Sequence, residues 1–310
     1  MRFKLTGERT IDAADASGTL LFDVGRRRWS DEVCEALELP LAWLPEVHES
    51  TEVATAGDQA AAALGVGLTA PGGPLSVVLG TSGVVFAVLP DYEPDVEARV
   101  HVFCHAVPAT WHAMGVMLSA AGSFAWLRHV LGADYAVLDE EASRWSPGSE
   151  GLLFAPYLAG ERTPHADPDA RGALTGLSLR HDRGALARAV LEGVAFGLRD
   201  SLELLRALGV RADVGRVSGG GARSALWLRI VASVLQLPLE RTESEEGSAF
   251  GAALLAGVRA GVFADAAEAV ARCVRVRDRV DPVWDYEETY ARFRQLYPAT
   301  ARLRPSTAPS

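Results

Sequence analysis

The segment PLSVVLGTSGVVFAVL, residues 74–89, decides how this chain folds. Its two halves, Ser76–Leu79 and Val84–Leu89, are apolar and β-branched, and the small residues Gly80-Thr81-Ser82-Gly83 separate them. This pattern predicts two strands joined by a tight turn. The turn glycines can adopt positive φ, so that successive N–H groups converge on an anion, and the two hydroxyls can donate to a phosphate. From these residues alone, an ordinary hairpin turn stays the alternative.

The composition bounds the size of the fold and the class of ligand. The chain has 310 residues, 49% of them hydrophobic, which suffices for one large domain or two of ordinary size. The net charge of -10 argues against nucleic acid or an anionic membrane surface as the main partner. It leaves room for a phosphorylated ligand, because backbone N–H groups hold phosphate without net positive charge.

The cysteines and the apolar runs indicate the compartment. Cys34, Cys104 and Cys273 are odd in number and far apart, which is typical of reduced thiols rather than of a disulfide framework. No apolar run reaches transmembrane length, and the first ten residues lack the apolar core of a signal peptide. We therefore expect a cytoplasmic protein that has no membrane partner.

A carboxylate lies upstream of the hairpin, in TAGDQAAAALGVG at residues 55–67. Gly57 precedes Asp58, and an alanine-rich helix is predicted over Gln59–Leu64, so Asp58 lies at a helix N-terminus. It is either an N-cap, which stabilises by roughly 1 kcal/mol, or a general base on a rigid helix end. The two roles are compatible. The Pro- and Gly-rich stretch Leu68–Pro74 predicts a boundary between a unit at residues 1–70 and a domain at residues 71–310.

A second glycine cluster follows further along the chain. Arg216–Ser218 predicts a strand, Gly219-Gly220-Gly221 a turn, and Ala222–Leu235 a helix. The amides of such a turn and the helix N-terminus form a platform for a nucleotide. The cluster does not match G-x-G-x-x-G, so a Rossmann dinucleotide site is not indicated. Three consecutive glycines favour close approach of another backbone or a ligand over a simple turn.

Four stretches together resemble the FGGY family of carbohydrate kinases, and within it the xylulose kinases most. They are TIDAADASGTLLFDVGRRRWSDEV with ESTEVA, AGDQAAAALGVG with LGTSGVV, LAGERTPHADPDARGALTGLSLRHDRGALARAVLEGVAFG, and VSGGGARSALWLRIVASVLQLPL with EEGSAFGAALLAG. The resemblance covers nearly the whole chain. It implies an α/β fold with an actin-like, ribonuclease-H-like C-terminal domain and a partial first domain of the same type.

The resemblance also implies a set of site residues. Asp58 matches the general base that accepts the proton of the sugar hydroxyl, and Gln59 matches a neighbour that can contact the sugar. The positions that match the ATP-binding loops are Gly80, Thr81, Ser82, Gly122, Gly219, Gly220, Gly221, Ala222 and Ser224. ATP and Mg²⁺ are the implied cofactors, no protein ligand to the metal is assigned, and a homodimer is one possible assembly.

The implied reaction is transfer of the γ-phosphate of ATP to a hydroxyl of a pentulose, D-xylulose first among them, giving D-xylulose 5-phosphate. A kinase for glycerol, gluconate or ribulose is the alternative within the same chemistry. An inactive remnant that at most binds nucleotide is the alternative from another class.

Three departures from the family pattern affect these expectations. The Gly-Thr hairpin and the Met-His-Gly stretch near the family's start have no match here, the segment between Val53 and Ala56 is short, and Ala185 replaces a polar residue. We therefore interpret the chain as a truncated kinase and expect little or no sugar kinase activity from it alone. We also expect Thr19–Phe22 and the Asp58 helix to be poorly covered.

Two smaller signals remain. The neighbours Glu161 and Arg162 are expected to form an ion pair in a structural loop. His101, His105 and His112 with Cys104 could suggest a metal site, but no metal-ligand spacing supports one.

Overall fold

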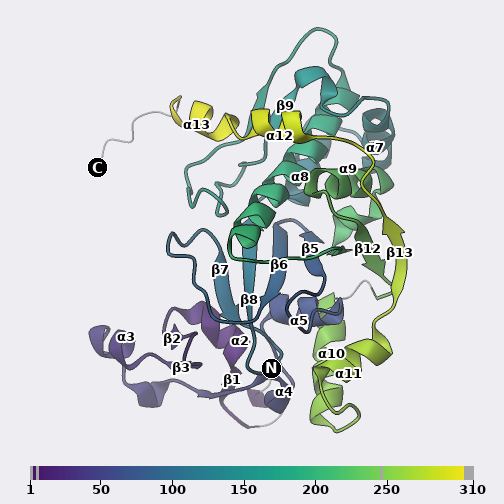
Figure 1. The fold of residues 1–310 in the computed structure, drawn as a ribbon. Coiled ribbons are helices and arrows are strands. Elements are labelled where there is room, and N and C mark those ends of the chain that lie inside the picture. Colours follow the sequence, from purple (N-terminus) through teal and green to yellow (C-terminus); the bar gives the residue numbers. More distant parts are fainter. Residues whose placement is uncertain (1–2, 5–6, 245–246, 304–310) are drawn as a thin grey trace.

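One seven-stranded mixed sheet organises the chain in a computed structural model that describes residues 3–4, 7–244 and 247–303 (Figure 1). The strands run in the order β13-β12-β11-β5-β6-β8-β7 across the sheet. Their bounds are β5 (Leu75–Leu79), β6 (Gly83–Leu89), β7 (His101–Cys104), β8 (Trp111–Met117), β11 (Gly215–Ser218), β12 (Leu239–Thr242) and β13 (Val276–Val280). Strands mixed with long helices confirm the α/β class.

The strand directions divide the sheet into two parts. The strands β5, β6 and β8 form an antiparallel meander, and β7 extends it at one edge. On the other side of β5, β11 and then β12 are added in parallel, and the antiparallel β13 completes that edge. The chain therefore returns to the first strand of the meander after a long excursion and continues the sheet from there.

The hairpin predicted over residues 74–89 is confirmed. Leu79 pairs with Gly83, so that Gly80, Thr81 and Ser82 form the turn. Neither turn glycine adopts the positive φ that we considered for it. A Cβ on Gly83 would lie 2.7 Å from the Met117 side chain and 3.0 Å from the Cβ of Ala120, so this end of the turn has no room for a side chain.

The middle strand β6 is buried along its whole length because it feeds two cores. Val85, Ala87 and Leu89 belong to the core under α8 (Arg183–Ala207), and Val84, Phe86 and Val88 belong to the core under α5 (Asp58–Gly65). Alternate side chains of a strand point to opposite faces, so a sheet that is covered on both sides requires a continuous apolar run.

Helix α8 is the longest element of the described structure, with 25 residues. Asp182 caps its first turn by accepting the amide of Ala185. Inside the core, Arg188 and Glu192 form an ion pair at 2.7 Å, and the hydroxyl of Tyr286 joins both side chains. The two residues lie one turn apart on the helix. Burial of both charges is tolerated because they pair with each other and also form hydrogen bonds with Tyr286.

The remaining helices cover the sheet and its ends. Figure 1 shows the N-terminal segment (purple) at one end of the molecule and α12 and α13 (yellow) at the other, with the sheet between them. These helices are α6 (Ala121–Leu131), α7 (Tyr135–Ser143), α9 (Ala225–Leu235), α10 (Gly247–Arg259), α11 (Ala266–Cys273), α12 (Glu287–Phe293) and α13 (Leu296–Ala301). Within the described residues, no helix combines the length and the apolar composition that a membrane crossing requires.

The segment before α5 is built from short elements. Its bounds are β1 (Thr10–Asp12), α2 (Ala13–Ala16), β2 (Phe22–Asp23), β3 (Arg28–Trp29), α3 (Asp31–Ala36), β4 (Glu46–His48) and α4 (Ser50–Val53). The strand β1 pairs in parallel with β4, and β2 forms a small hairpin with β3. Phe22 is buried against Trp29, whereas Leu20 is 88% exposed, so the expected lack of cover holds for only part of Thr19–Phe22.

The expectation that the Asp58 helix is poorly covered is wrong. Leu64 is fully buried, and α5 packs against both the sheet and α10. The two helices cross through glycines: a methyl group on Gly251 would overlap the carbonyl oxygen of Ala61, and one on Gly65 would overlap that of Gly247. Close approach of the two backbones therefore depends on the absence of Cβ atoms at this crossing.

The substitution Gly251→Ala tests this crossing. Alanine raises helix propensity by about 1 kcal/mol, but a clash with a backbone oxygen forces two packed helices apart. We expect the free energy of unfolding to fall by about 2 kcal/mol in urea titrations. Gly18→Ala is the control, because its methyl group would meet only the ring of Phe103 at 4.0 Å. An unchanged stability of Gly251→Ala would show that the helices can separate freely.

Two buried histidines predict a loss of stability in acid. Burial lowers the pKa of His105 to about 4, and it lowers the pKa of His112, which stacks on Phe86, well below its usual value. In the unfolded chain both titrate near 6.5. Their contribution is therefore complete above pH 6.5 and is lost as the pH falls toward 4, by about 3 kcal/mol for His105.

The matching measurement is urea unfolding at several pH values between 8 and 4.5. His112→Phe keeps the stacking and removes one titrating group, so we expect a shallower loss of stability with acid than in the wild type. His129→Phe, at an exposed position, should keep the wild-type slope. Parallel slopes for all three proteins would contradict the assignment to His112.

Candidate active site

The start of helix α6 holds the turn of the β5–β6 hairpin. The amide of Ala121 donates to the carbonyl of Gly80 at 2.8 Å, and the amides of Ala120 and Gly122 donate to the carbonyl of Thr81 at 2.8 and 3.1 Å. A Cβ on Gly122 would lie 3.1 Å from that same Thr81 oxygen. The structure thus brings Gly122 against Gly80 and Thr81, three of the predicted ATP-binding positions.

The second glycine cluster abuts the same turn. Gly219 has φ of +91°, and a Cβ there would lie 2.7 Å from the carbonyl carbon and oxygen of Leu79 and 3.0 Å from the amide nitrogen of Gly80. Gly221 is also enclosed, since its Cβ would meet the side chains of Trp227 and Leu79 at 2.8 and 2.9 Å. Close approach of another backbone, predicted for the three glycines, is confirmed at Gly219, whereas Gly221 is enclosed by side chains.

Beyond Gly219 the chain makes one 3₁₀ turn, Gly220–Arg223, and enters α9. Ser224 is the N-cap of α9: it accepts the amide of Trp227 at 3.0 Å and donates to the carboxylate of Asp139. Gly220 faces open space, with no heavy atom within 4 Å of a Cβ placed on it. The free space beside the loop is therefore on the Gly220 side.

A cavity of about 160 Å³ lies beside this loop. Its lining combines glycine backbone, hydroxyls and three arginines, namely Ser218, Gly219, Gly220, Ala222, Arg223, Arg241, Thr242, Ser244 and Arg277 with Val217. Arg241 donates to the carbonyl of Ala222 at 3.1 Å and pairs with Asp278 at 2.7 Å. Backbone amides, a helix N-terminus and guanidinium groups are suited to an anionic ligand.

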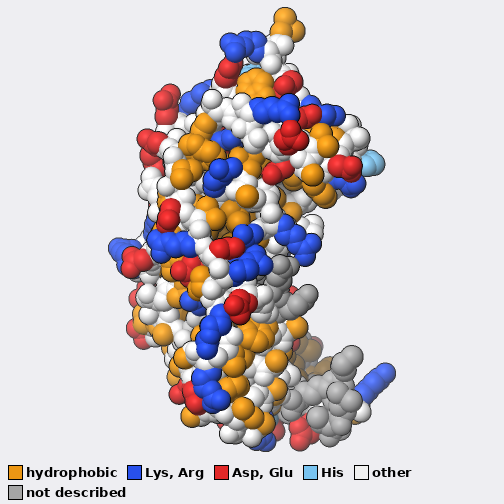
Figure 2. Space-filling view, turned by 90° about the vertical axis from the view of Figure 1, so that its right-hand side faces the viewer, with side chains coloured by type: hydrophobic (Ala, Val, Ile, Leu, Met, Phe, Trp, Pro, Cys, Tyr) orange, Lys and Arg blue, Asp and Glu red, His pale blue; other side chains and the backbone are white. Residues whose placement is uncertain are grey.

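The arginines of this cavity do not belong to a broad basic surface. Figure 2 shows the side of the molecule that carries β13, where basic and acidic side chains are interspersed. On β13 itself, Arg277 pairs with Asp278, and Arg279 pairs with Asp281 just beyond the strand. Arg241 and Arg277 of the cavity thus share the carboxylate of Asp278, which partly offsets their positive charge.

Asp58 and Gln59 lie at the N-terminus of α5. Gly57 is the N-cap and Asp58 is the first helical residue, one position earlier than the predicted helix start. Asp58 is exposed, and its carbonyl accepts the hydroxyl of Ser248 on α10 at 3.1 Å. Within the described residues, no hydrogen bond joins Asp58 to either glycine loop. The structure brings the two loops together and leaves this carboxylate on a separate helix end.

Glu161 is a residue of this region whose role the sequence did not reveal. It is 2% exposed, and its Oε1 accepts the amides of Leu118 at 2.9 Å and of Arg162 at 2.8 Å. Burial raises the pKa of Glu161 to about 7. The prediction of an ion pair between Glu161 and Arg162 is wrong. Among the described residues, the Glu161 carboxylate accepts backbone amides, and a guanidinium nitrogen of Arg162 lies 3.3 Å from Nε2 of His101.

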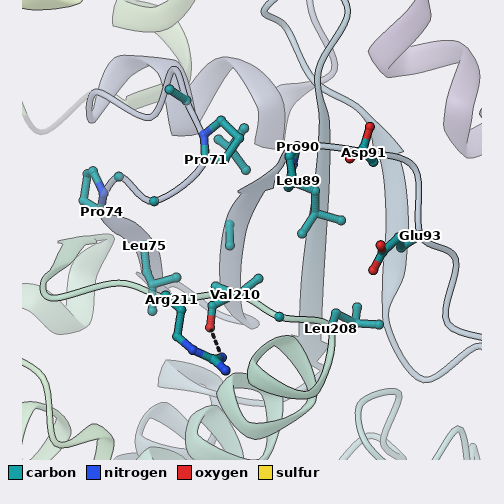
Figure 3. Close-up of a pocket in the computed structure, with 16 residues that line it drawn as sticks. Pro71, Pro74, Leu75, Leu89, Pro90, Asp91, Glu93, Leu208, Val210 and Arg211 are labelled. Atoms are coloured by element: carbon teal, nitrogen blue, oxygen red, sulfur yellow. Dashed lines mark hydrogen bonds between the residues drawn. The ribbon is translucent and has the colours of Figure 1, made fainter.

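A larger cavity lies at the other end of β5 and β6 (Figure 3). It measures about 330 Å³ and is lined by the 68–74 linker region, the end of β6 and the turn after α8. Pro71, Pro74 and Leu89 face it together with the acidic Asp91 and Glu93, and no predicted site residue does. A choice by cavity size would therefore not select the cavity beside the glycine loops. The backbone amides and arginines of that smaller cavity suit an anionic ligand better.

Metal binding by protein side chains alone has no support in the described part of the chain. No group of three His, Cys, Asp or Glu side chains is arranged there to hold an ion. Mg²⁺ usually keeps several waters and binds through substrate phosphates with one or two carboxylates. A site of that kind needs a phosphate at the glycine loops, and their amides and arginines fit one.

Comparisons with known proteins identify the family of this chain. The model of the C-terminal domain of the FGGY family of carbohydrate kinases matches residues 75–260, and that of the N-terminal domain matches residues 1–89. The xylulose kinase of Escherichia coli K12 is 39% identical over 282 residues, which are 84% of this chain and 58% of that protein. A glycerol kinase of Citrifermentans bemidjiense is 34% identical over 287 residues, 85% of this chain and 58% of that protein.

A solved structure shows the same fold. The crystal structure of a xyloylose kinase from Brucella ovis superimposes with a TM-score of 0.90 at 38% identity, over 98% of this chain and 67% of that one. The chain thus spans about three fifths of the length of the curated relatives compared here. The sheet is the actin-like, ribonuclease-H-like one that the resemblance implied. This chain belongs to the FGGY family of carbohydrate kinases.

Proposed function

We propose that this chain binds ATP in the cavity on the Gly220 side of the Gly219–Ser224 loop, next to the Gly80–Ser82 turn, and acts in phosphoryl transfer to a pentulose. The observation that carries the proposal is the contact of Gly219 with Leu79 and Gly80, which places two glycine loops side by side. Beside them lies a cavity lined by three arginines. Backbone amides of Gly80, Gly219 and Gly220 would position the phosphates, and Ser224 would fix the start of α9 behind them.

The acceptor side of the site is assigned to α5. The exposed Asp58 carboxylate would accept the proton of the sugar hydroxyl as its oxygen bonds to phosphorus, and Gln59 would contact the sugar. Mg²⁺ would neutralise charge on the phosphates and would be held by phosphate oxygens and water. One carboxylate suffices for this step, because little covalent chemistry falls to the protein.

D-xylulose is the acceptor that we propose, with D-xylulose 5-phosphate as the product. Several xylulose kinases at 30–39% identity support it, beside a glycerol kinase at 34%. Glycerol, gluconate and ribulose are the acceptors to compare. We also propose a cytoplasmic location, which the three unpaired cysteines support.

Gly219→Ala tests the nucleotide loop. The added methyl group would overlap the Leu79 carbonyl at a positive φ, so the two loops must move apart. We expect the Kd for ATP with Mg²⁺, measured by isothermal titration calorimetry, to rise at least tenfold. Gly209→Ala is the matched control, because Gly209 has φ of +85° and no heavy atom within 4 Å of its Cβ position. Equal affinities in all three proteins would place the nucleotide elsewhere.

Asp58→Asn tests the general base. We expect ADP release in a coupled assay to depend on D-xylulose more than on glycerol, gluconate or ribulose. The variant should lower this sugar-dependent rate at least a hundredfold and leave the Kd for ATP unchanged, because the carboxylate acts only on the acceptor. Asp31→Asn, at the exposed first residue of helix α3, is the control.

The outcomes separate the alternatives. ATP binding without any sugar-dependent ADP release would indicate a nucleotide-binding remnant and would contradict the transferase proposal. Release that is faster with glycerol than with D-xylulose would overturn the choice of acceptor alone.

A further inference from the structure

We infer that Glu161 is a positioning residue that fixes the phosphate-side turn Gly80–Ser82 through the backbone of residues 116–122. The inference concerns how the turn is held, and it depends on the proposed function only for the nature of the ligand.

Glu161 holds the chain just after β8. One carboxylate oxygen, Oε1, accepts the amide of Leu118, and the same oxygen accepts the amide of Arg162 beside it. The second oxygen, Oε2, is buried and has no hydrogen-bond partner within the described residues. The side chain is 43 positions away from Leu118 in sequence, so this bond ties two distant segments together.

Thr163 adds a second tie to the same segment. Its amide donates to the carbonyl of Val116 at 3.0 Å, and its hydroxyl oxygen accepts the amide of Val116 at 3.0 Å. The hydroxyl donates in turn to the carbonyl of Arg99 at 2.7 Å. Residues 161 and 163 thus fasten alternate residues, 118 and 116, of the chain that leaves the sheet.

The segment held by Glu161 and Thr163 leads directly to the residues that form hydrogen bonds with the turn. The hydroxyl of Ser82 donates to the carbonyl of Leu118 at 3.4 Å, and the next amides, those of residues 120–122, donate to the carbonyls of Gly80 and Thr81. Every described hydrogen bond between α6 or its entry and the turn therefore lies within four residues of Leu118. A shift of Leu118 would displace all of them together.

Removing the carboxylate would leave the partly buried amide of Leu118 without its acceptor. Glu161→Gln keeps the Oε1 acceptor and removes the charge, so it preserves the tie. Because burial raises the pKa of Glu161 to about 7, the uncharged side chain resembles a form that the wild type already populates near neutral pH. Glu161→Ala removes the tie altogether, and Glu161→Asp shortens its reach while keeping the charge.

The experiment measures amide hydrogen exchange in the purified chain, with peptides that cover residues 78–83 and 116–124. We expect Glu161→Ala to raise the exchange rates of the amides of Leu118 and of residues 120–122 at least tenfold, and Glu161→Gln to stay within threefold of the wild type. Glu192→Ala is the matched control, because Glu192 is also a buried glutamate that accepts a backbone amide, that of Gly148 at 3.1 Å. It should destabilise the chain without a selective effect on these peptides.

The Kd for ATP with Mg²⁺, by calorimetry, is the second readout. We expect it to rise at least tenfold in Glu161→Ala and to recover in Glu161→Gln. Should the alanine variant fail to fold, Glu161→Asp takes its place, with the same direction expected for both readouts.

The outcomes distinguish this inference from the proposed function. Unchanged exchange of residues 118–122 in Glu161→Ala and Glu161→Asp would overturn the positioning role, even if the wild type binds ATP. Selective loosening of these amides in a chain that binds no ATP would support the positioning role and contradict the proposed ligand. Loosening with an unchanged Kd would overturn the link between the tie and nucleotide binding.

Discussion

The parallel pairing of β5 with β11 is the constraint on which the candidate site depends. Val78 is paired with Ser218, so the two strands end at the same level of the sheet. Neighbouring strands are only about 4.8 Å apart, so the chain must leave both strands through adjacent space. Gly219 resolves the crowding, since any Cβ there would overlap the Leu79 carbonyl. Contact between the two loops thus depends on Gly219 rather than on a glycine of the hairpin turn.

The remaining contacts of the hairpin turn follow from the order of the strands beside it. Strand β8 lies beside β6 and ends where the hairpin turns, with Met117 opposite Gly83. The chain that leaves β8 must therefore pass the turn before α6 begins, and its amides meet the carbonyls of Gly80 and Thr81. The buried carboxylate of Glu161 accepts one amide within that passage, that of Leu118, and so supplies the order that a loop of small residues lacks.

The sequence predicted the local features of this arrangement and missed the non-local ones. The hairpin, the strand before Gly219, the helix after it and the helix behind Asp58 are written in short patterns of apolar and small residues. The contact of Gly219 with Leu79 depends on strand register across 140 residues, which no local pattern specifies. The adjacent opposite charges of Glu161 and Arg162 suggest an ion pair, which the structure does not contain. The Glu161 carboxylate is buried and accepts the amide of the distant Leu118 together with that of Arg162, and no local pattern specifies the distant partner. The cover of α5 could not be predicted from the sequence, because the helix that packs on it, α10, lies far away in the chain.

The same sheet also determines where Asp58 can lie. Helix α5 is held between the Val84–Phe86–Val88 face of β6 and α10, and the glycine crossing leaves no room for the helix to rotate away from that face. The two glycine loops follow strands of the same sheet. The hairpin turn joins β5 to β6, and the Gly219 loop follows β11, which is separated from β6 by β5. Helix α5 and the two loops are thus attached to the same sheet through independent contacts. The packing of the β6 core sets the position of α5 relative to the two loops. A core substitution in β6 would therefore shift Asp58 relative to the loops without changing any proposed ligand-binding residue.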